Sequence, residues 1–202
     1  MSTNKNLNLK EAFALAIQEH QKKNLHAAHD LYNQILKIEP NHIHANNNLG
    51  VLLQEIGRSE EAITCFLQVI KHAPNHAKAC NNLGNVYHQL GKNKEAINFH
   101  EKAIEIDPNY IDAYYCLGVV FTALNSNTQK ELSCYEKVLE LDPNHVSANY
   151  NLANIFQKLV NYPEAIKHYQ KVIAISPNHT NAYNNLGTVF KETGEYQKSF
   201  DC

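Results

Sequence analysis

The residues best suited to metal or acid–base chemistry in this 202-residue chain are its twelve histidines. Four of them recur in an Asn-His pair that follows a proline: His42, His76, His145 and His179. None has a Cys or carboxylate partner at a spacing typical of zinc sites. We therefore expect loop histidines that face solvent, with no metal site.

Catalytic motifs are not found in the sequence. It contains no G-x-G-x-x-G, no G-x-x-x-x-G-K-[ST] and no H-E-x-x-H, and no Ser or Cys stands in a recognisable nucleophile context. The sequence predicts that this segment is not an enzyme and that it uses no cofactor.

A second kind of chemistry is offered by asparagines that recur at a regular interval, joined in two places by tyrosines. A carboxamide offers both a donor and an acceptor, so a row of them could bind the backbone of an extended peptide with little dependence on its sequence. Tyrosines are common anchors in binding sites. The candidate binding residues are Asn47, Asn48, Lys78, Asn81, Asn82, Asn85, Tyr115, Tyr150, Asn151, Asn154, Asn184 and Asn185. The alternative is that the row serves helix packing or solubility.

The elements that position these residues repeat in tandem. Five of the six prolines, at 40, 74, 108, 143 and 177, are spaced by 34, 34, 35 and 34 residues. The seven glycines keep the same interval, ten or seventeen residues after one of these prolines. A unit of this size cannot bury its own apolar face, so it must stack on its neighbours.

Residues 43–76 show the structure expected of one unit. Apolar residues at helical spacing predict one helix that ends near Gly57, and a second apolar face predicts another helix that ends before Pro74. The two helices form an antiparallel hairpin. Gly50 lies in mid-helix, where Gly is unfavourable by roughly 1 kcal/mol relative to Ala. Its recurrence predicts a close helix crossing, and Ala16 and Ala153 occupy this position in two other copies.

The copies share one order of residues: Asn-Leu-Gly, then an aromatic residue or Leu, then Gly, then Glu-Ala-Ile, then an aromatic residue, and finally Asp-Pro-Asn. This pattern resembles the tetratricopeptide repeat. The resemblance implies an all-α fold, a right-handed superhelix (solenoid) of antiparallel helix pairs. It also implies that the first helices line a concave groove that binds an extended peptide or a partner helix. A polar tail, residues 1–8, precedes the array, residues 9–202. The expected repeats are residues 9–42, 43–76, 77–110, 111–145 and 146–179, with a partial copy at 180–202.

Residues 81–87, Asn-Asn-Leu-Gly-Asn-Val-Tyr, are similar to the superhelix attached to protein O-GlcNAc transferases. This resemblance gives the function two alternatives. The chain is a non-catalytic scaffold or adaptor, or it is the substrate-recruiting N-terminal region of a larger enzyme such as a glycosyltransferase. The charged clamp by which related adaptors hold chaperone tails needs several groove cations, and Lys78 and Lys158 alone do not supply it.

The copy at residues 111–145 departs from the pattern. It is one residue longer, has Asn125 in place of the turn glycine, and has Glu131 where the other copies have Ala. Asn tolerates the left-handed conformation better than most residues, so we expect a longer turn at residues 125–128. This change is either a tolerated surface insertion or a kink that reshapes the groove.

Composition limits the classes of partner. The net charge is -2 and Arg58 is the only arginine, so we expect no nucleic-acid partner. No secretory signal and no membrane-spanning apolar run is present, and the five cysteines show no C-x-x-C spacing, which indicates the reducing cytoplasm. The partial last copy leaves an apolar face at Tyr196 and Phe200 uncapped, so we expect that the chain's end can self-associate with other copies.

Overall fold

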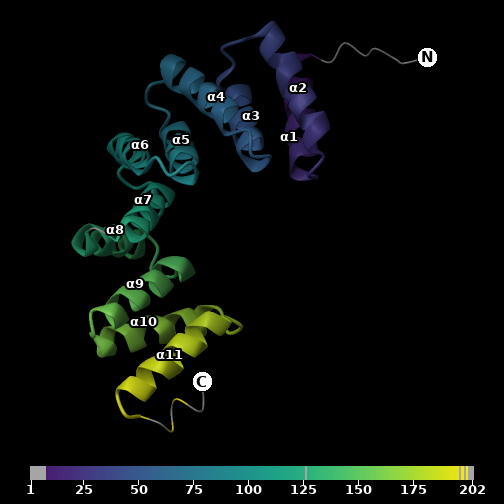
Figure 1. Cartoon of the computed structure of the whole chain (residues 1–202). Coiled ribbons are helices and arrows are strands. Elements are labelled where there is room, and N and C mark those ends of the chain that lie inside the picture. The colour runs from purple at the N-terminus through teal and green to yellow at the C-terminus, as the bar shows by residue number, and fades with distance from the viewer. Residues whose placement is uncertain (1–7, 126, 196, 198, 200–202) are drawn as a thin grey trace. The chain divides into compact units, whose positions relative to one another are not determined.

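The computed structural model describes residues 8–125, 127–195, 197 and 199. In this part of the chain all regular structure is helical, so the predicted all-α class of stacked helix pairs is confirmed (Figure 1). The helices are α1 (Leu9–Gln21), α2 (Leu25–Ile38), α3 (Ile43–Glu55), α4 (Ser59–His72), α5 (Ala77–Gln89), α6 (Asn93–Ile106), α7 (Ile111–Leu124), α8 (Thr128–Leu141), α9 (Val146–Lys158), α10 (Tyr162–Ile175) and α11 (Thr180–Glu192). Some features expected from the sequence lie outside the described residues. They are Ser126 of the turn at residues 125–128, residues 1–7 of the polar tail, and Tyr196 and Phe200 of the apolar face.

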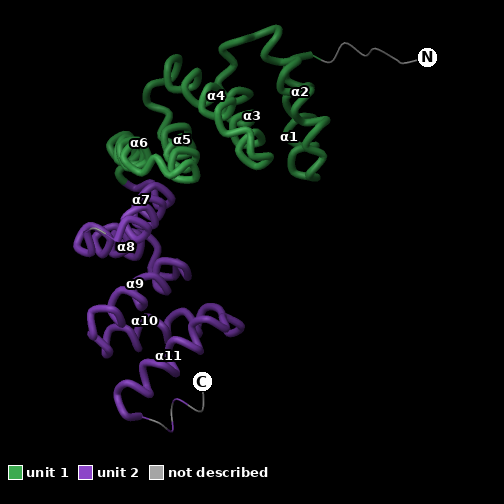
Figure 2. Tube along the Cα trace, viewed as in Figure 1, with its two compact units in different colours: residues 1–108 green, residues 109–202 purple. Residues whose placement is uncertain are grey.

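The chain divides into two compact units, residues 1–108 and 109–202 (Figure 2). In unit 1 the hairpins α1–α2, α3–α4 and α5–α6 stack in sequence, and the first helices α1, α3 and α5 also contact one another in turn. In unit 2 the hairpins are α7–α8 and α9–α10, with α11 packed on both α9 and α10. Each unit thus brings the first helices of consecutive repeats to one face.

The turn inside each hairpin contains one residue with a positive φ. Glycine provides it at Gly57, Gly91 and Gly194, with φ between 71 and 79°. Lys23, Asn125 and Val160 take the same place in the other turns, with φ of 61, 48 and 60°. The predicted left-handed conformation of Asn125, the C-cap of α7, is confirmed. The expectation of a longer turn is wrong, because α8 begins at Thr128 and the extra residue lies in α7, which has 14 residues where α5 and α9 have 13. Val160 is the least expected of the three, because a β-branched residue rarely adopts this conformation.

The mid-helix glycines mark close crossings, as the sequence predicted. A Cβ atom at Gly50 would lie 2.7 Å from the Phe66 ring, and one at Gly118 would lie 2.8 Å from the Tyr135 ring. Gly84 faces His100 in the same way, at 2.7 Å. The backbone of the first helix therefore packs directly on a ring from the second helix of the same hairpin.

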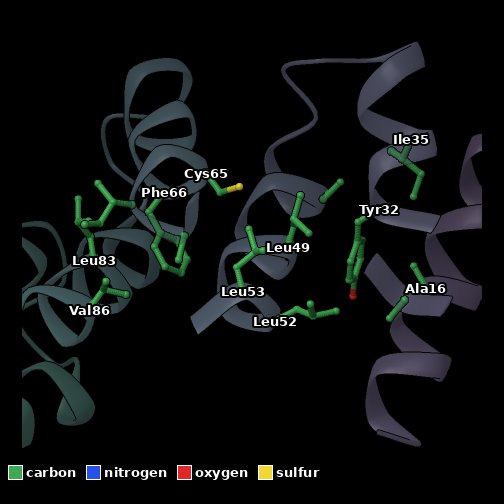
Figure 3. Packing of buried hydrophobic residues seen from close by; sticks show 14 residues of the cluster. Ala16, Tyr32, Ile35, Leu49, Leu52, Leu53, Cys65, Phe66, Leu83 and Val86 are labelled. Atoms are coloured by element: carbon green, nitrogen blue, oxygen red, sulfur yellow. The ribbon is translucent and has the colours of Figure 1, made fainter. Parts of the chain in front are cut away.

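These rings form the centre of each hairpin's core. Tyr32, Phe66, His100, Tyr135 and Tyr169 occupy equivalent places, and all five are 0% exposed. Figure 3 shows Tyr32 and Phe66 on either side of the α3 leucines Leu49, Leu52 and Leu53. The apolar layer is thus continuous from α1 to α5 in unit 1.

The histidines of the Asn-His pairs are not solvent-facing loop residues, and that expectation is wrong. They are partly buried N-caps of the next first helix. In each case the imidazole Nδ1 accepts a hydrogen bond of 3.1 Å from the backbone N–H of an alanine three residues on: His42, His76, His145 and His179. An acceptor at Nδ1 requires a neutral ring. Burial lowers the pKa of His76, which favours that neutral form.

Candidate functional site

Unit 1 has a groove of about 480 Å³ on the face formed by α1, α3 and α5. Most of its lining side chains are polar. They are Ile17, His20, Gln21, Lys23, Tyr32, Asn47, Asn48, Val51, Glu55, Lys78 and Asn82. Four of the residues predicted from the sequence, on α3 and α5, are therefore in one place.

The asparagines of this groove are bonded to one another across two repeats. The Asn82 side chain on α5 donates to Oδ1 of Asn47 on α3 at 3.3 Å, and Asn47 donates to Oδ1 of Asn48 at 3.2 Å. Asn47 is 5% exposed, whereas Asn48 and Asn82 are partly exposed. Because a carboxamide has two donor and two acceptor positions, the chain of bonds orients the three amides and leaves further positions for a ligand.

Charged groups lie at the edges of the same groove. Glu55 accepts a hydrogen bond from Lys23 at 2.9 Å and lies 3.4 Å from His20. The bond from Lys23, together with the nearby His20, holds the pKa of Glu55 below its usual range. Lys78 has no carboxylate within 4.0 Å among the described residues, so the groove retains a cation that the protein does not neutralise locally.

The Tyr32 hydroxyl lies at the base of the groove. The side chain is 0% exposed and lines the groove from α2. Its oxygen makes no well-aligned hydrogen bond to a described residue, and burial raises the pKa of Tyr32, with the nearby Asn48 side chain partly offsetting the effect. A buried hydroxyl without a partner is unfavourable by about 1–3 kcal/mol, so a ligand or water atom in the groove would relieve this cost.

Unit 2 carries a different polar surface on its first helices. Asn185 of α11 donates to the Tyr150 hydroxyl at 3.1 Å and to Oδ1 of Asn154 at 3.0 Å. The Tyr169 hydroxyl donates to the same Asn154 oxygen at 2.6 Å. Three predicted residues, Tyr150, Asn154 and Asn185, are therefore connected to Tyr169, the buried ring of the α9–α10 hairpin.

The two predicted tyrosine anchors pack on the next repeat. The Tyr115 ring lies 5.1 Å from the His145 ring, and the Tyr150 ring lies 4.9 Å from the His179 ring. Both histidines are N-caps, so the tyrosines stabilise the junctions between consecutive helix pairs. Both side chains remain partly exposed.

The remaining predicted residues are dispersed. Asn81 is 3% exposed, and its Oδ1 lies 2.8 Å from Nδ1 of His100, inside the hairpin. Asn85 is partly exposed and Asn184 is exposed. Asn151 and Asn154 line a second, smaller cavity of about 120 Å³ in unit 2.

Sequence reasoning missed several residues that line the two cavities. Tyr32, Glu55 and His20 were not selected because none of them belongs to the asparagine row. Glu131, which lines the smaller cavity, did carry a signal, since it replaces the alanine of the other repeats. Its partner Thr122 carried none.

Comparison with known families agrees with this architecture. Models described as TPR repeat match residues 55–91 and 84–125, and models described as tetratricopeptide repeat match residues 31–64, 146–179 and 168–200. Together they cover most of both units. The chain belongs to the tetratricopeptide repeat family. A search of curated proteins gave no match.

Solved TPR structures share the fold at low sequence identity. PilF of Pseudomonas aeruginosa is 18% identical with a TM-score of 0.86, covering 96% of this chain and 87% of that one. MamA of Desulfovibrio magneticus RS-1 is 22% identical with a TM-score of 0.73, covering 85% and 96%. YrrB, described as a TPR protein with an unusual peptide-binding site, is 22% identical with a TM-score of 0.70, covering 84% and 87%. None of these matches is to an O-GlcNAc transferase.

Two negative findings concern the described residues. No helix there has the length and apolarity needed to cross a bilayer. No group of three or more His, Cys, Asp or Glu side chains in that part of the chain is arranged to hold a metal ion.

Proposed function

We propose that this TPR protein is a non-catalytic scaffold that binds an extended peptide segment of a partner protein along its first helices. The observation that supports this most is the bonded row of amides from Asn48 through Asn47 to Asn82, which crosses from one repeat to the next inside the 480 Å³ groove of unit 1. Amides fixed by their neighbours are preorganised, which lowers the entropic cost of binding.

The groove chemistry favours an extended peptide over an amphipathic helix. A helix that lies in a groove needs a hydrophobic trough for its apolar anchors, but Ile17 and Val51 are the only aliphatic side chains among the residues that line this groove. An extended peptide instead offers a backbone N–H and C=O at each residue, and these match the carboxamides. The fold that this chain shares with YrrB, a TPR protein described as having a peptide-binding site, adds support.

The test uses purified protein and a display library of unstructured peptides, followed by calorimetry with one selected peptide. We expect Asn48→Ala together with Asn82→Ala to weaken binding by at least ten-fold, since each lost amide removes a hydrogen bond worth about 1 kcal/mol. The matched control is Asn41→Ala, at an exposed turn residue of the same unit. Equal affinity of the double variant and the wild type, with unchanged urea unfolding, would move the interaction away from this groove.

A further inference from the structure

One buried carboxylate breaks the pattern of the repeats. Four hairpins have a fully buried alanine four residues before the central ring of the second helix: Ala28, Ala62, Ala96 and Ala165. In unit 2, α8 has Glu131 at this place, and the whole residue is only 7% exposed. A buried ionised carboxylate is costly unless it is paired and hydrogen-bonded, so its partners decide what it does.

The partners of the Glu131 carboxylate within this chain are hydroxyl groups. Thr122 of α7 donates to Oε1 of Glu131 at 2.6 Å, a length typical of a hydroxyl bonded to an ionised carboxylate. The Tyr135 hydroxyl lies 3.0 Å from the same Thr122 oxygen and therefore donates to it. Burial raises the pKa of Tyr135, so this phenol keeps its proton. The chain of donors runs from Tyr135 to Thr122 to Glu131 and stabilises the negative charge.

No cation of the described chain neutralises that charge. No Lys, Arg or His nitrogen of the described residues lies within 4.0 Å of the Glu131 carboxylate. Lys158 lines the same cavity, but its ammonium group donates to Oδ1 of Asn125. The carboxylate is thus held in place by neutral donors and has no counter-ion.

The cavity beside Glu131 has the size and the lining for a compact cation. It measures about 120 Å³, well above the roughly 15 Å³ that a water-sized group needs. Besides the carboxylate, oxygen acceptors on Thr128 and Asn151 line it, whereas Oδ1 of Asn154 already accepts from Asn185 and Tyr169. An ammonium group has three donors and no acceptor, so it can use the carboxylate and two of these oxygens at once.

We propose that this cavity is a subsite for the ammonium group of a lysine side chain in a peptide bound along the first helices of unit 2. The inference rests on the proposed peptide-binding function and adds a specificity-determining residue, Glu131, to it. Because Glu replaces Ala in this one repeat, the polar surface of unit 2 then prefers a lysine at one position of the peptide.

The direct test titrates wild-type protein with Nα-acetyl-lysine methylamide and follows the side-chain amide signals of Asn151 and Asn154 by NMR. The norleucine counterpart, which has the same carbon chain without the charge, is the control probe. We expect saturable shifts with the lysine probe alone and at least ten-fold weaker binding in Glu131→Gln. Glu131→Ala, which restores the residue of the other repeats, should fold normally and show the same loss. Equal binding of both probes, no saturable shift with the lysine probe, or equal binding by wild type and Glu131→Gln would overturn the proposal.

The display library separates this inference from the general function. A lysine preferred at one peptide position by the wild type, and no longer preferred by Glu131→Gln, supports the subsite. Peptides selected without any preference for lysine would overturn the subsite and leave the groove function standing. If the lysine probe binds while no peptide is selected, the subsite stands and the extended-peptide function fails.

Discussion

Each unit has a carboxylate that lines a cavity, but the two carboxylates differ in burial and in their bonding partners. In unit 1 the Glu55 side chain is 35% exposed and paired with Lys23 and His20. In unit 2 Glu131 is 7% exposed and bonded to the hydroxyl of Thr122. Both units use the same hairpin, with a small residue packed on a ring. The comparison teaches that the shared Gly, Ala and Pro residues determine the backbone, while the polar residues that vary between copies determine the chemistry of each groove.

The central rings differ in the same manner. Unit 2 has Tyr135 and Tyr169, whose hydroxyls bond to neighbours, whereas the α5–α6 hairpin of unit 1 has His100. The imidazole Nδ1 of His100 meets Oδ1 of Asn81 at 2.8 Å, and its Nε2 is buried with no hydrogen-bond partner among the described residues. The α5–α6 hairpin of unit 1 therefore has an imidazole, which can gain a proton, at the place where the hairpins of unit 2 have a phenol.

The largest effect that we expect is a loss of stability of unit 1 in acid, which would distinguish it from unit 2. Burial, with a smaller contribution from His88, lowers the pKa of His100 to about 4. The unfolded chain binds this proton near pH 6.5, so stability is present above that pH and is lost as pH falls toward 4. The difference corresponds to ~3 kcal/mol. Hydrogen exchange of the α5 and α6 amides, compared at pH 7 and pH 4.5, measures the loss after correction for the intrinsic rate.

The control for the acid response is His100→Phe. Phe66 occupies the equivalent place opposite Gly50, so a phenylalanine fits the geometry that Gly84 provides. The variant should lose most of the difference in opening free energy between the two pH values, while unit 2 should respond as in the wild type. If the wild type and the variant lose protection equally, carboxylates and the N-cap histidines account for the acid sensitivity.

A smaller effect tests whether the close packing of a first-helix glycine on a second-helix ring is equivalent in the two units. In Gly118→Ala the new Cβ would lie 2.8 Å from the Tyr135 ring, which is fully buried. Overpacking costs about 1–3 kcal/mol and the gain in helix propensity is about 1 kcal/mol, so urea unfolding should show a net loss of up to about 2 kcal/mol.

The matched change in unit 1 is Gly84→Ala, whose Cβ would lie 2.7 Å from the His100 ring. We expect a similar loss. A stabilised Gly84→Ala variant beside a destabilised Gly118→Ala variant would mean that the crossings of the two units are not equivalent. Ala153→Gly provides the reverse control, because that hairpin already accommodates a Cβ and should lose only about 1 kcal/mol of helix propensity.

Much of the fold could be predicted from the sequence because its signals are local. Pro74 and Gly57 end helices through backbone geometry, and Gly50 reports a close crossing since no other role explains glycine in mid-helix. The N-cap histidines were missed for the opposite reason. Ser, Thr, Asp and Asn are the usual side-chain caps, and a cap by an imidazole nitrogen, as at His76, has no common sequence signature.

The candidate site was only partly predictable because it depends on the direction in which each helix faces. Neighbouring residues on a helix point about 100° apart, so the sequence alone does not tell which of two adjacent asparagines lines the groove: Asn47 and Asn48 both do. In the structure Asn82 lines the groove and Asn81 turns inward to His100. The pairing of Glu131 with Thr122 joins two helices, and no spacing within either helix indicates it.

The smallest expected effect concerns the hairpin turns, where unit 1 has Gly91 and unit 2 has Val160 at the left-handed position. Val160 has φ of 60° and is 66% exposed, so Val160→Gly relieves the strained conformation without removing buried surface. Left-handed strain of about 1–2 kcal/mol exceeds the added unfolded-state entropy of about 0.5–1 kcal/mol, and urea unfolding should show a gain of about 0.5–1 kcal/mol. Gly91→Ala is the converse test. Nothing lies within 4 Å of its Cβ, so its loss should come from conformation alone and be of similar size. A Val160→Gly variant less stable than the wild type would show that the valine side chain contributes contacts that outweigh its strain.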